Sequence, residues 1–405
     1  MTFGNDPAKL DRYRAFWSRG DASRPLTGFT LAGWFPMQEF AACLTWQPHR
    51  YLEPAMISPA DFFVDHLRML REGETMDDDL IRGACPGQLA FPWLAGMLGC
   101  EVRILPSTIV GAEMHFDWER ALAVRLDRSS PWYRKYMEYA DALVELAADR
   151  FPVSHSAEIG PTDLHAVLRG HTRSLIDLAD EPQKSGELLA QLGAIFREAT
   201  DDIWRRLPLY HGGYFDAQYS LWAPGRIVRM QEDATAVYSP RLYRRFVQPV
   251  DREIVRHYES SFIHLHSTSM FLLDAFLEIE EIRCFEVNND ALGPGVPAMV
   301  PFFQRIQRAC RPLLIKGSFT PDELKLLANR LEARGLFLNV MVQSMAEVSP
   351  CGACWACVAP ALPTCVQFCT LGLGRTPMRF TAGRHSDASQ MAVSGQFPSV
   401  RTSGH

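Results

Sequence analysis

The sequence predicts an α/β fold, a (β/α)8 TIM barrel with a long insertion after its first strand. From about residue 150 to residue 345, short apolar runs alternate with longer amphipathic ones, as expected for repeated β/α units around a parallel sheet. An earlier apolar run supplies the first strand. Eight parallel strands with intervening helices favour closure into a barrel. The predicted strands span residues 27–33, 153–159, 213–219, 227–231, 262–266, 282–287, 313–317 and 336–342.

Helix signals lie between these strands. Ser239 and Pro240 predict an N-cap followed by proline at the first helical position. Thr320 and Glu323 predict a capping box, at the start of a helix that Gly335 is expected to end. A shorter helix is expected over residues 269–279, directly after the fifth strand.

The predicted insertion spans residues 36–150, within a barrel unit that spans residues 1–349. We expect it to contain a helix near residues 60–71, a hairpin through 102–118 and a helix over 132–150, and to cover one end of the barrel. Residues 350–405 form an atypical Cys/Gly/Ser-rich tail without helical or strand periodicity, which we expect to be disordered or non-native.

Five of the ten cysteines crowd into the start of this tail. Cys351, Cys354 and Cys357 form a C-x-x-C-x-x-C run, a spacing that can bind zinc or an iron–sulfur cluster. The next two, Cys365 and Cys369, fit neither a ferredoxin run nor a zinc ribbon. Metal binding by the tail and a non-native tail are both open interpretations.

Charge and hydropathy exclude several classes of protein. The 405 residues carry a formal net charge of −6 without a Lys/Arg cluster, so we expect neither a nucleic-acid surface nor a surface for anionic membranes. No apolar run approaches the roughly 20 residues of a membrane helix. The first residues lack the basic and apolar regions of a secretory signal, and we therefore expect a cytoplasmic location.

Two histidines at the end of the fifth strand are the strongest functional signal. His264 and His266 lie two residues apart, which places both on one face of a strand. Imidazole is a common metal ligand and titrates near neutral pH, so the pair is a candidate for metal binding or for acid–base catalysis. A purely structural, hydrogen-bonded pair is the alternative.

Other residues at strand ends are candidates because the carboxyl ends of barrel strands surround the active site. We expect Asp290 to be catalytic, together with the two histidines. The candidates for substrate binding are Trp34, Tyr219, Gln231, Asp233 and Asn288. Arg226, Arg229 and Lys316 are possible partners for an anion, although such residues are often solvated. The isolated histidines His155, His165 and His211 are expected to be structural.

Several motifs, taken in order, resemble the uroporphyrinogen decarboxylase superfamily, which includes the decarboxylase and cobalamin-dependent methyltransferases. The likeness covers about residues 10–347. The resemblance implies a barrel with its site at the carboxyl ends of the strands. The motifs are Trp34-Phe35-Pro36, Ala95-Gly96-Met97-Leu98-Gly99-Cys100-Glu101-Val102, Gly160-Pro161-Thr162-Asp163, Glu232-Asp233 followed by Ser239-Pro240-Arg241-Leu242-Tyr243, and His264-Leu265-His266-Ser267.

The resemblance implies methyl transfer, with a corrinoid protein as the methyl donor and zinc as a possible cofactor. In the family's methyltransferases a His-x-Cys pair on the corresponding strand and a later cysteine bind the zinc that activates a thiol. Here the pair is His264 and His266, and the eighth predicted strand has no cysteine. A complete site therefore needs a third ligand such as Asp290 or Glu232.

Two other functions are open. One is decarboxylation of a tetrapyrrole or another carboxylated substrate, in which Asp290 or a histidine handles the proton. The decarboxylase has an arginine-rich motif after its first strand, where this chain has Trp34-Phe35-Pro36-Met37-Gln38-Glu39. The other is a non-catalytic barrel that binds a small molecule.

Overall fold

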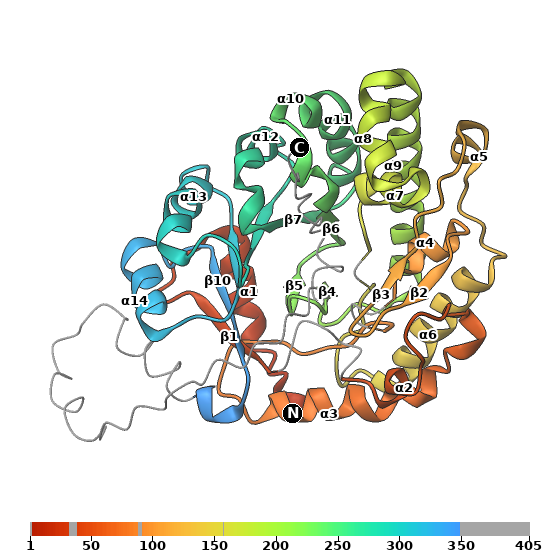
Figure 1. Cartoon of the computed structure of the whole chain (residues 1–405). Coiled ribbons are helices and arrows are strands. Elements are labelled where there is room, and N and C mark those ends of the chain that lie inside the picture. Colours follow the sequence, from red (N-terminus) through yellow and green to blue (C-terminus); the bar gives the residue numbers. More distant parts are fainter. Residues whose placement is uncertain (1, 32–38, 88–90, 157, 349–405) are drawn as a thin grey trace, which may run out of the picture.

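The computed structural model describes residues 2–31, 39–87, 91–156 and 158–348. Its centre is a six-stranded parallel sheet in the order β1-β10-β9-β8-β7-β6 (Figure 1). Six of the predicted strands are thus confirmed. Their bounds are β1 Leu26–Leu31, β6 Ile227–Gln231, β7 Ser260–His266, β8 Cys284–Asn289, β9 Leu313–Gly317 and β10 Leu336–Val342.

Helices connect these strands, as the alternating pattern predicts. After β6 come η5 Asp233–Val237, α10 Pro240–Leu242, η6 Tyr243–Val247 and α11 Gln248–Val255. After β7 come η7 Ser267–Leu272 and α12 Leu273–Leu277, after β8 comes α13 Val296–Arg308, and after β9 comes α14 Pro321–Arg330. Every residue of β9 and β10 is buried, which explains why these strands read as continuous apolar runs.

The predicted caps are present. The Ser239 hydroxyl accepts a hydrogen bond from the Leu242 amide at the start of α10. Thr320 and Glu323 form the capping box of α14. Gly335 does not end this helix, which stops at Arg330; its φ of 64° instead serves the turn before β10.

Two predicted strands differ from the sequence expectation. Residues 213–219 do not add a parallel strand: β4 Tyr214–Asp216 pairs antiparallel with β5 Leu221–Ala223 as a separate hairpin. From residues 153–159 the structure has one parallel bridge, between Val153 and Ala84. A turn at residues 217–220 reverses the chain after β4, which propensity over a short apolar run does not reveal.

The space between the edge strands β1 and β6 contains two extended segments, residues 79–84 and 152–156. The Asp79 amide donates to the Thr27 carbonyl of β1 at 2.9 Å, and the Ser154 amide donates to the Ala84 carbonyl at 2.9 Å. Further along, Gly160 packs on the Gln231 carbonyl of β6 so closely that a Cβ would lie 1.8 Å from its oxygen. The segments therefore lead from one edge of the sheet toward the other.

The remaining described residues form helices, loops and one further hairpin. The predicted helices and hairpin of residues 36–150 are found as α3, β2 with β3, and α6. Trp34 with its neighbours and the cysteine-rich tail lie outside the described residues. The remaining bounds are η1 Thr2–Gly4, α1 Lys9–Ser18, α2 Ala41–Leu44, η3 Pro54–Met56, η4 Pro59–Phe62, α3 Phe63–Glu74, α4 Trp93–Met97, β2 Val102–Ile104, β3 Ile109–Gly111, α5 Trp118–Ala123, α6 Pro131–Ala147, α7 Pro161–Arg169, α8 His171–Asp180 and α9 Pro182–Arg206. Among the described residues, no helix has both the length and the apolar character needed to cross a membrane.

His165 on α7 gives the fold a defined acid sensitivity. It is fully buried, and neither ring nitrogen has a hydrogen-bond partner among the described residues. Burial lowers the pKa of His165 to about 4, partly opposed by Asp177. Between about pH 6.5 and about pH 4 the unfolded chain therefore binds a proton that the folded chain does not, and the free energy of unfolding falls by about 1.4 kcal/mol per pH unit as the pH drops.

We expect His165→Leu to remove this dependence. Between about pH 7.5 and about pH 5, the wild type should lose about 2 kcal/mol more of its unfolding free energy than the variant, as measured by urea titration at both pH values. The control is His115→Asn, since His115 is exposed and asparagine tolerates its φ of 48°. Equal losses in wild type and His165→Leu would show that His165 is not the responsible group.

Candidate metal centre

Three potential metal ligands converge beyond the carboxyl ends of β6 and β7. His264 and His266 lie at the end of β7, and Asp233 lies two residues beyond the end of β6. The parallel register pairs Gln231, the last residue of β6, with His264, so β7 extends two residues further and Asp233 follows β6 beside this extension. One donor atom from each of Asp233, His264 and His266 lies within 4.8 Å of the other two. We call these three residues the metal site.

His264 is held by two oxygens on one ring nitrogen. Its Nδ1 lies 2.7 Å from the Tyr219 hydroxyl and 2.5 Å from Oε2 of Glu286, its register partner on β8. All three side chains are buried. Because Nδ1 is engaged, Nε2 is the nitrogen that His264 can offer to a metal, as in the carboxylate–histidine pairs of metal sites.

His266 has a similar arrangement. Its Nδ1 lies 2.9 Å from Oδ1 of Asp290, and Oδ2 of Asp290 accepts hydrogen bonds from the amide and the hydroxyl of Ser267, both at 2.8 Å. On the other side, Nε2 of His266 lies 3.7 Å from Oδ2 of Asp233. The ring is thus placed between two carboxylates.

Electrostatics favour a positive charge at this position. Burial by itself lowers the pKa of His266, but hydrogen bonds and charge interactions with Asp233 and Asp290 outweigh it and raise the pKa to about 11. Burial raises the pKa of each of these carboxyls, and their interaction with His266 more than reverses this, so both pKa values are lowered. These contacts favour the protonated form of His266 and the charged forms of Asp233 and Asp290.

The other predicted residues are distributed around this centre. The Gln231 side-chain amide donates to Oδ2 of Asp233 at 2.5 Å. Asn288 pairs with His266 in the strand register, and its buried Oδ1 has no hydrogen-bond partner among the described residues. Tyr219 is fully buried, so its hydroxyl reaches His264 within the core.

The sequence suggested Asp290 or Glu232 as a third ligand. Among the described residues, the carboxylate that could share a metal with the two histidines is that of Asp233. Asp290 bonds to Nδ1 of His266, the nitrogen on the ring side opposite Nε2. Glu232 accepts hydrogen bonds from the amide and hydroxyl of Thr162 at the start of α7. Glu232 and Asp233 therefore serve different neighbours, α7 and His266.

Sequence reasoning missed Glu286. It lies inside a buried apolar strand, with Phe285 before it and Val287 after it, and is itself fully buried. A buried carboxylate is rare unless it is paired, so an acid in such a run was a usable signal. Its partner, His264, could not be chosen without the register of β7 and β8.

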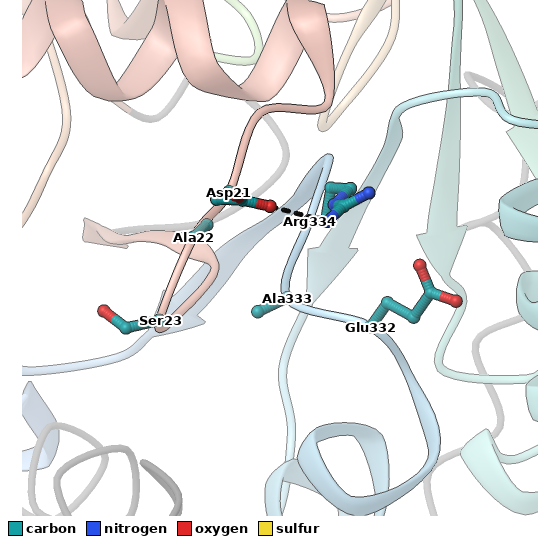
Figure 2. A pocket seen from close by; sticks show the side chains of 6 residues that line it. All are labelled: Asp21, Ala22, Ser23, Glu332, Ala333 and Arg334. Atoms are coloured by element: carbon teal, nitrogen blue, oxygen red, sulfur yellow. Dashed lines mark hydrogen bonds and ion pairs between the residues drawn. The ribbon is translucent and has the colours of Figure 1, made fainter.

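An open cavity lies at the opposite end of the sheet. It has a volume of about 660 Å³ and is lined by Asp21, Ala22, Ser23, Glu332, Ala333 and Arg334. These residues precede β1 and β10 in the chain, and an ion pair between Asp21 and Arg334 crosses the cavity wall (Figure 2). It is an open depression between two loops and contains none of the metal-site residues.

Comparisons with known proteins relate the chain to others through its fold. No protein-family model matches the sequence. No curated protein sequence matches it either. Among solved structures, the chain is similar to a methyltransferase from Methanosarcina mazei, with a TM-score of 0.57 and 12% sequence identity over 88% of this chain and 98% of that chain. At this level of identity the likeness shows a shared fold.

Proposed function

We propose that this chain is an enzyme of the uroporphyrinogen decarboxylase superfamily that transfers a methyl group at the metal site. The observation that carries the proposal is the convergence of Asp233, His264 and His266 beyond the carboxyl ends of two parallel strands. The sequence motifs and the fold shared with a methyltransferase support it. The finer fold we propose is a closed (β/α)8 barrel in which residues 79–84 and 152–156 take the second and third strand positions.

The donor set fits zinc. Catalytic zinc sites use three protein ligands drawn from histidine, cysteine and carboxylates, and leave one position open. Ligands about 2.1 Å from a tetrahedral zinc lie about 3.4 Å apart, so donors that are all within 4.8 Å need only a small approach. Both histidines have Nδ1 engaged by carboxylates, which orients such ligands.

The residues of the chain then have distinct roles. A bound zinc ion would supply stabilisation of the thiolate form of an acceptor thiol. Glu286 and Tyr219 orient His264, and Asp290 orients His266. The acceptor thiol loses its proton to solvent and its sulfur forms a bond to the methyl carbon, while the bond between that carbon and its donor breaks with the electron pair staying on the donor. A corrinoid protein as this donor is the proposal that follows from the sequence resemblance.

Measurement of bound metal and of methyl transfer tests this proposal. The purified full chain should lose about one zinc per molecule when His264 and His266 are both replaced by alanine, and the difference is diagnostic because tail cysteines are retained in both proteins. Replacing the histidines His49 and His257 instead should leave the zinc content unchanged. Wild-type protein should also convert methylcobalamin and 2-mercaptoethanol to a methyl thioether. No difference in zinc together with no methyl transfer would refute the proposal.

Decarboxylation is the second candidate, because His266 lies between the carboxylates of Asp233 and Asp290 and such a histidine can deliver a proton to the carbanion left by loss of carbon dioxide. Release of carbon dioxide from a polycarboxylated porphyrinogen, without methyl transfer, would favour it. Tight binding of a substrate without turnover would favour a non-catalytic binding barrel.

A further inference from the structure

Arg229 is a buried charge in the strand that leads to the metal site. It lies on β6 two residues before Gln231, so both side chains point to the same face of the sheet. Gln231 is the residue that holds Asp233. Arg229 is only 3% exposed, and a guanidinium group stays protonated in proteins. A full positive charge is therefore buried on the side of the sheet that carries the site.

This charge has no direct ion-pair partner in the described part of the chain, although the buried carboxylates of Asp216 and Glu286 act on the same neighbours, Tyr219 and Lys316. No carboxylate among the described residues forms an ion pair with Arg229, and its buried Nε and Nη1 atoms have no hydrogen-bond partner there. The guanidinium group of Arg229 lies over the Tyr219 ring, with its carbon 5.9 Å from the ring centroid. Burying a charge without a direct partner costs several kcal/mol, and the Nε and Nη1 donors of Arg229 gain no hydrogen bond in return.

Two neighbours of Arg229 also have buried polar atoms without a hydrogen-bond partner among the described residues. These are Oε1 of Glu158 and Nε2 of His155, both in or next to the extended segment that precedes α7. Nε2 of His155 lies 3.9 Å from Oδ2 of Asp216, beyond hydrogen-bond distance. Each interacts electrostatically with Arg229. Burial raises the pKa of Glu158 to about 8, opposed by the Leu94 amide and by Arg229. Near neutral pH Glu158 is therefore mostly uncharged and does not neutralise the arginine.

A second cation, Lys316, lies in the same cluster, where the carboxylates of Glu286 and Asp216 offset part of the positive charge. Lys316 of β9 is buried, and its Nζ donates to the Gln218 carbonyl at 2.5 Å. Its ammonium nitrogen lies 5.0 Å from the centroid of the same Tyr219 ring that faces Arg229. Tyr219 in turn reaches His264. The cations and the metal site are thus joined through one side chain.

We propose that Arg229 binds an oxyanion, the carboxylate or phosphate group of a small substrate, with Glu158 and His155 as further polar contacts. A guanidinium fork with free donors fits an oxyanion better than any other common ligand. Two residues of strand separate Arg229 from the position level with His264, about 7 Å along the strand. The inference rests on the proposed function in one respect: the substrate is a methyl acceptor whose anionic group lies deeper in the barrel than its reacting atom.

Anion binding by the full-length protein tests the first part. Sodium acetate and sodium phosphate should each be compared with sodium chloride at equal ionic strength, by thermal unfolding and by titration calorimetry. We expect a saturable rise in Tm with at least one oxyanion and none with chloride, and the oxyanion that binds identifies the group. In Arg229→Met the affinity should fall by about 10-fold to 100-fold, and in the control Arg226→Met, at a partly exposed ion-paired arginine, it should not change.

Stability without the anion distinguishes a binding residue from a structural one. Because the unpaired charge is removed, Arg229→Met without oxyanion should have a Tm equal to or above that of the wild type. If this variant does not fold, Arg229→Lys serves instead, since it keeps the charge but loses the fork and should still weaken binding. A Tm that is unaffected by both oxyanions, or a wild-type response in the Arg229 variants, would overturn the proposal.

Kinetics with matched acceptors tests the link to methyl transfer. Mercaptoacetate carries a carboxylate that 2-mercaptoethanol lacks, so its KM should be lower in the wild type and the difference should vanish in Arg229→Met. Loss of the difference without a change in zinc content would assign the effect to acceptor binding. If zinc and methyl transfer are absent but the oxyanion still binds through Arg229, the anion site stands and the methyltransferase proposal fails. Equal KM values for both acceptors in the wild type would separate the anion site from the reaction and overturn its role in acceptor binding.

Discussion

Replacement of Asp233 by alanine is expected to remove zinc from the metal site and to abolish methyl transfer. Asp233 is the only carboxylate that groups with the two histidines among the described residues. Without it, the two histidines are the remaining donors of the metal site, and the positive charge of a metal is no longer balanced by a direct ligand. The loss of affinity should exceed the roughly 10-fold to 100-fold that follows removal of an outer-shell partner. Competition with a chromophoric chelator measures it.

Two variants make this result interpretable. Asp233→Asn keeps a carbonyl oxygen but removes the charge, so it should bind zinc more weakly than the wild type and more tightly than Asp233→Ala. Asp21→Ala removes an exposed acid at the far end of the sheet and should leave zinc affinity unchanged. Full zinc content in Asp233→Ala, together with wild-type activity, would mean that another residue is the third ligand.

Glu286→Gln is expected to weaken zinc binding by about 10-fold to 100-fold. Oε2 of Glu286 is 2.5 Å from Nδ1 of His264. A carboxylate there favours the tautomer that carries its proton on Nδ1, which leaves Nε2 unprotonated and available to the metal. An amide can donate as well as accept and no longer selects this tautomer. Zinc affinity and kcat should both fall, and they should be measured on the same preparations.

The role of Glu286 is positional, and its controls must separate this from stability. Glu278→Gln alters an exposed acid paired with Arg244 and should change neither zinc affinity nor kcat. Tyr219→Phe removes the second oxygen on Nδ1 and should have a smaller effect in the same direction. A fall in Tm for Glu286→Gln at unchanged zinc affinity would show that the residue only supports the fold.

Much of the fold could be predicted because its signals are local. Alternating short and long apolar segments predict strands and helices in order, and caps such as Ser239 and Thr320 depend on residues within one helical turn. The hairpin at residues 214–223 was mistaken for a barrel strand because an apolar run alone does not show with which strand it pairs. The apolar run at residues 153–159 predicts a strand, but among the described residues it forms one parallel bridge, to Ala84 in the segment 79–84, which the sequence pattern does not single out.

For the candidate site too, one part could be predicted from the sequence and another part could not. A spacing of two residues in a strand is sufficient to place His264 and His266 on one face, so the sequence by itself determined the histidine pair and its position at the carboxyl end of a strand. Only the tertiary structure decided which acids approach the pair: Asp233 in place of Glu232 or Asp290 as the third donor, and Glu286 behind His264. The reason is physical, because the register between separate strands sets these contacts, and that register results from packing across the whole sheet.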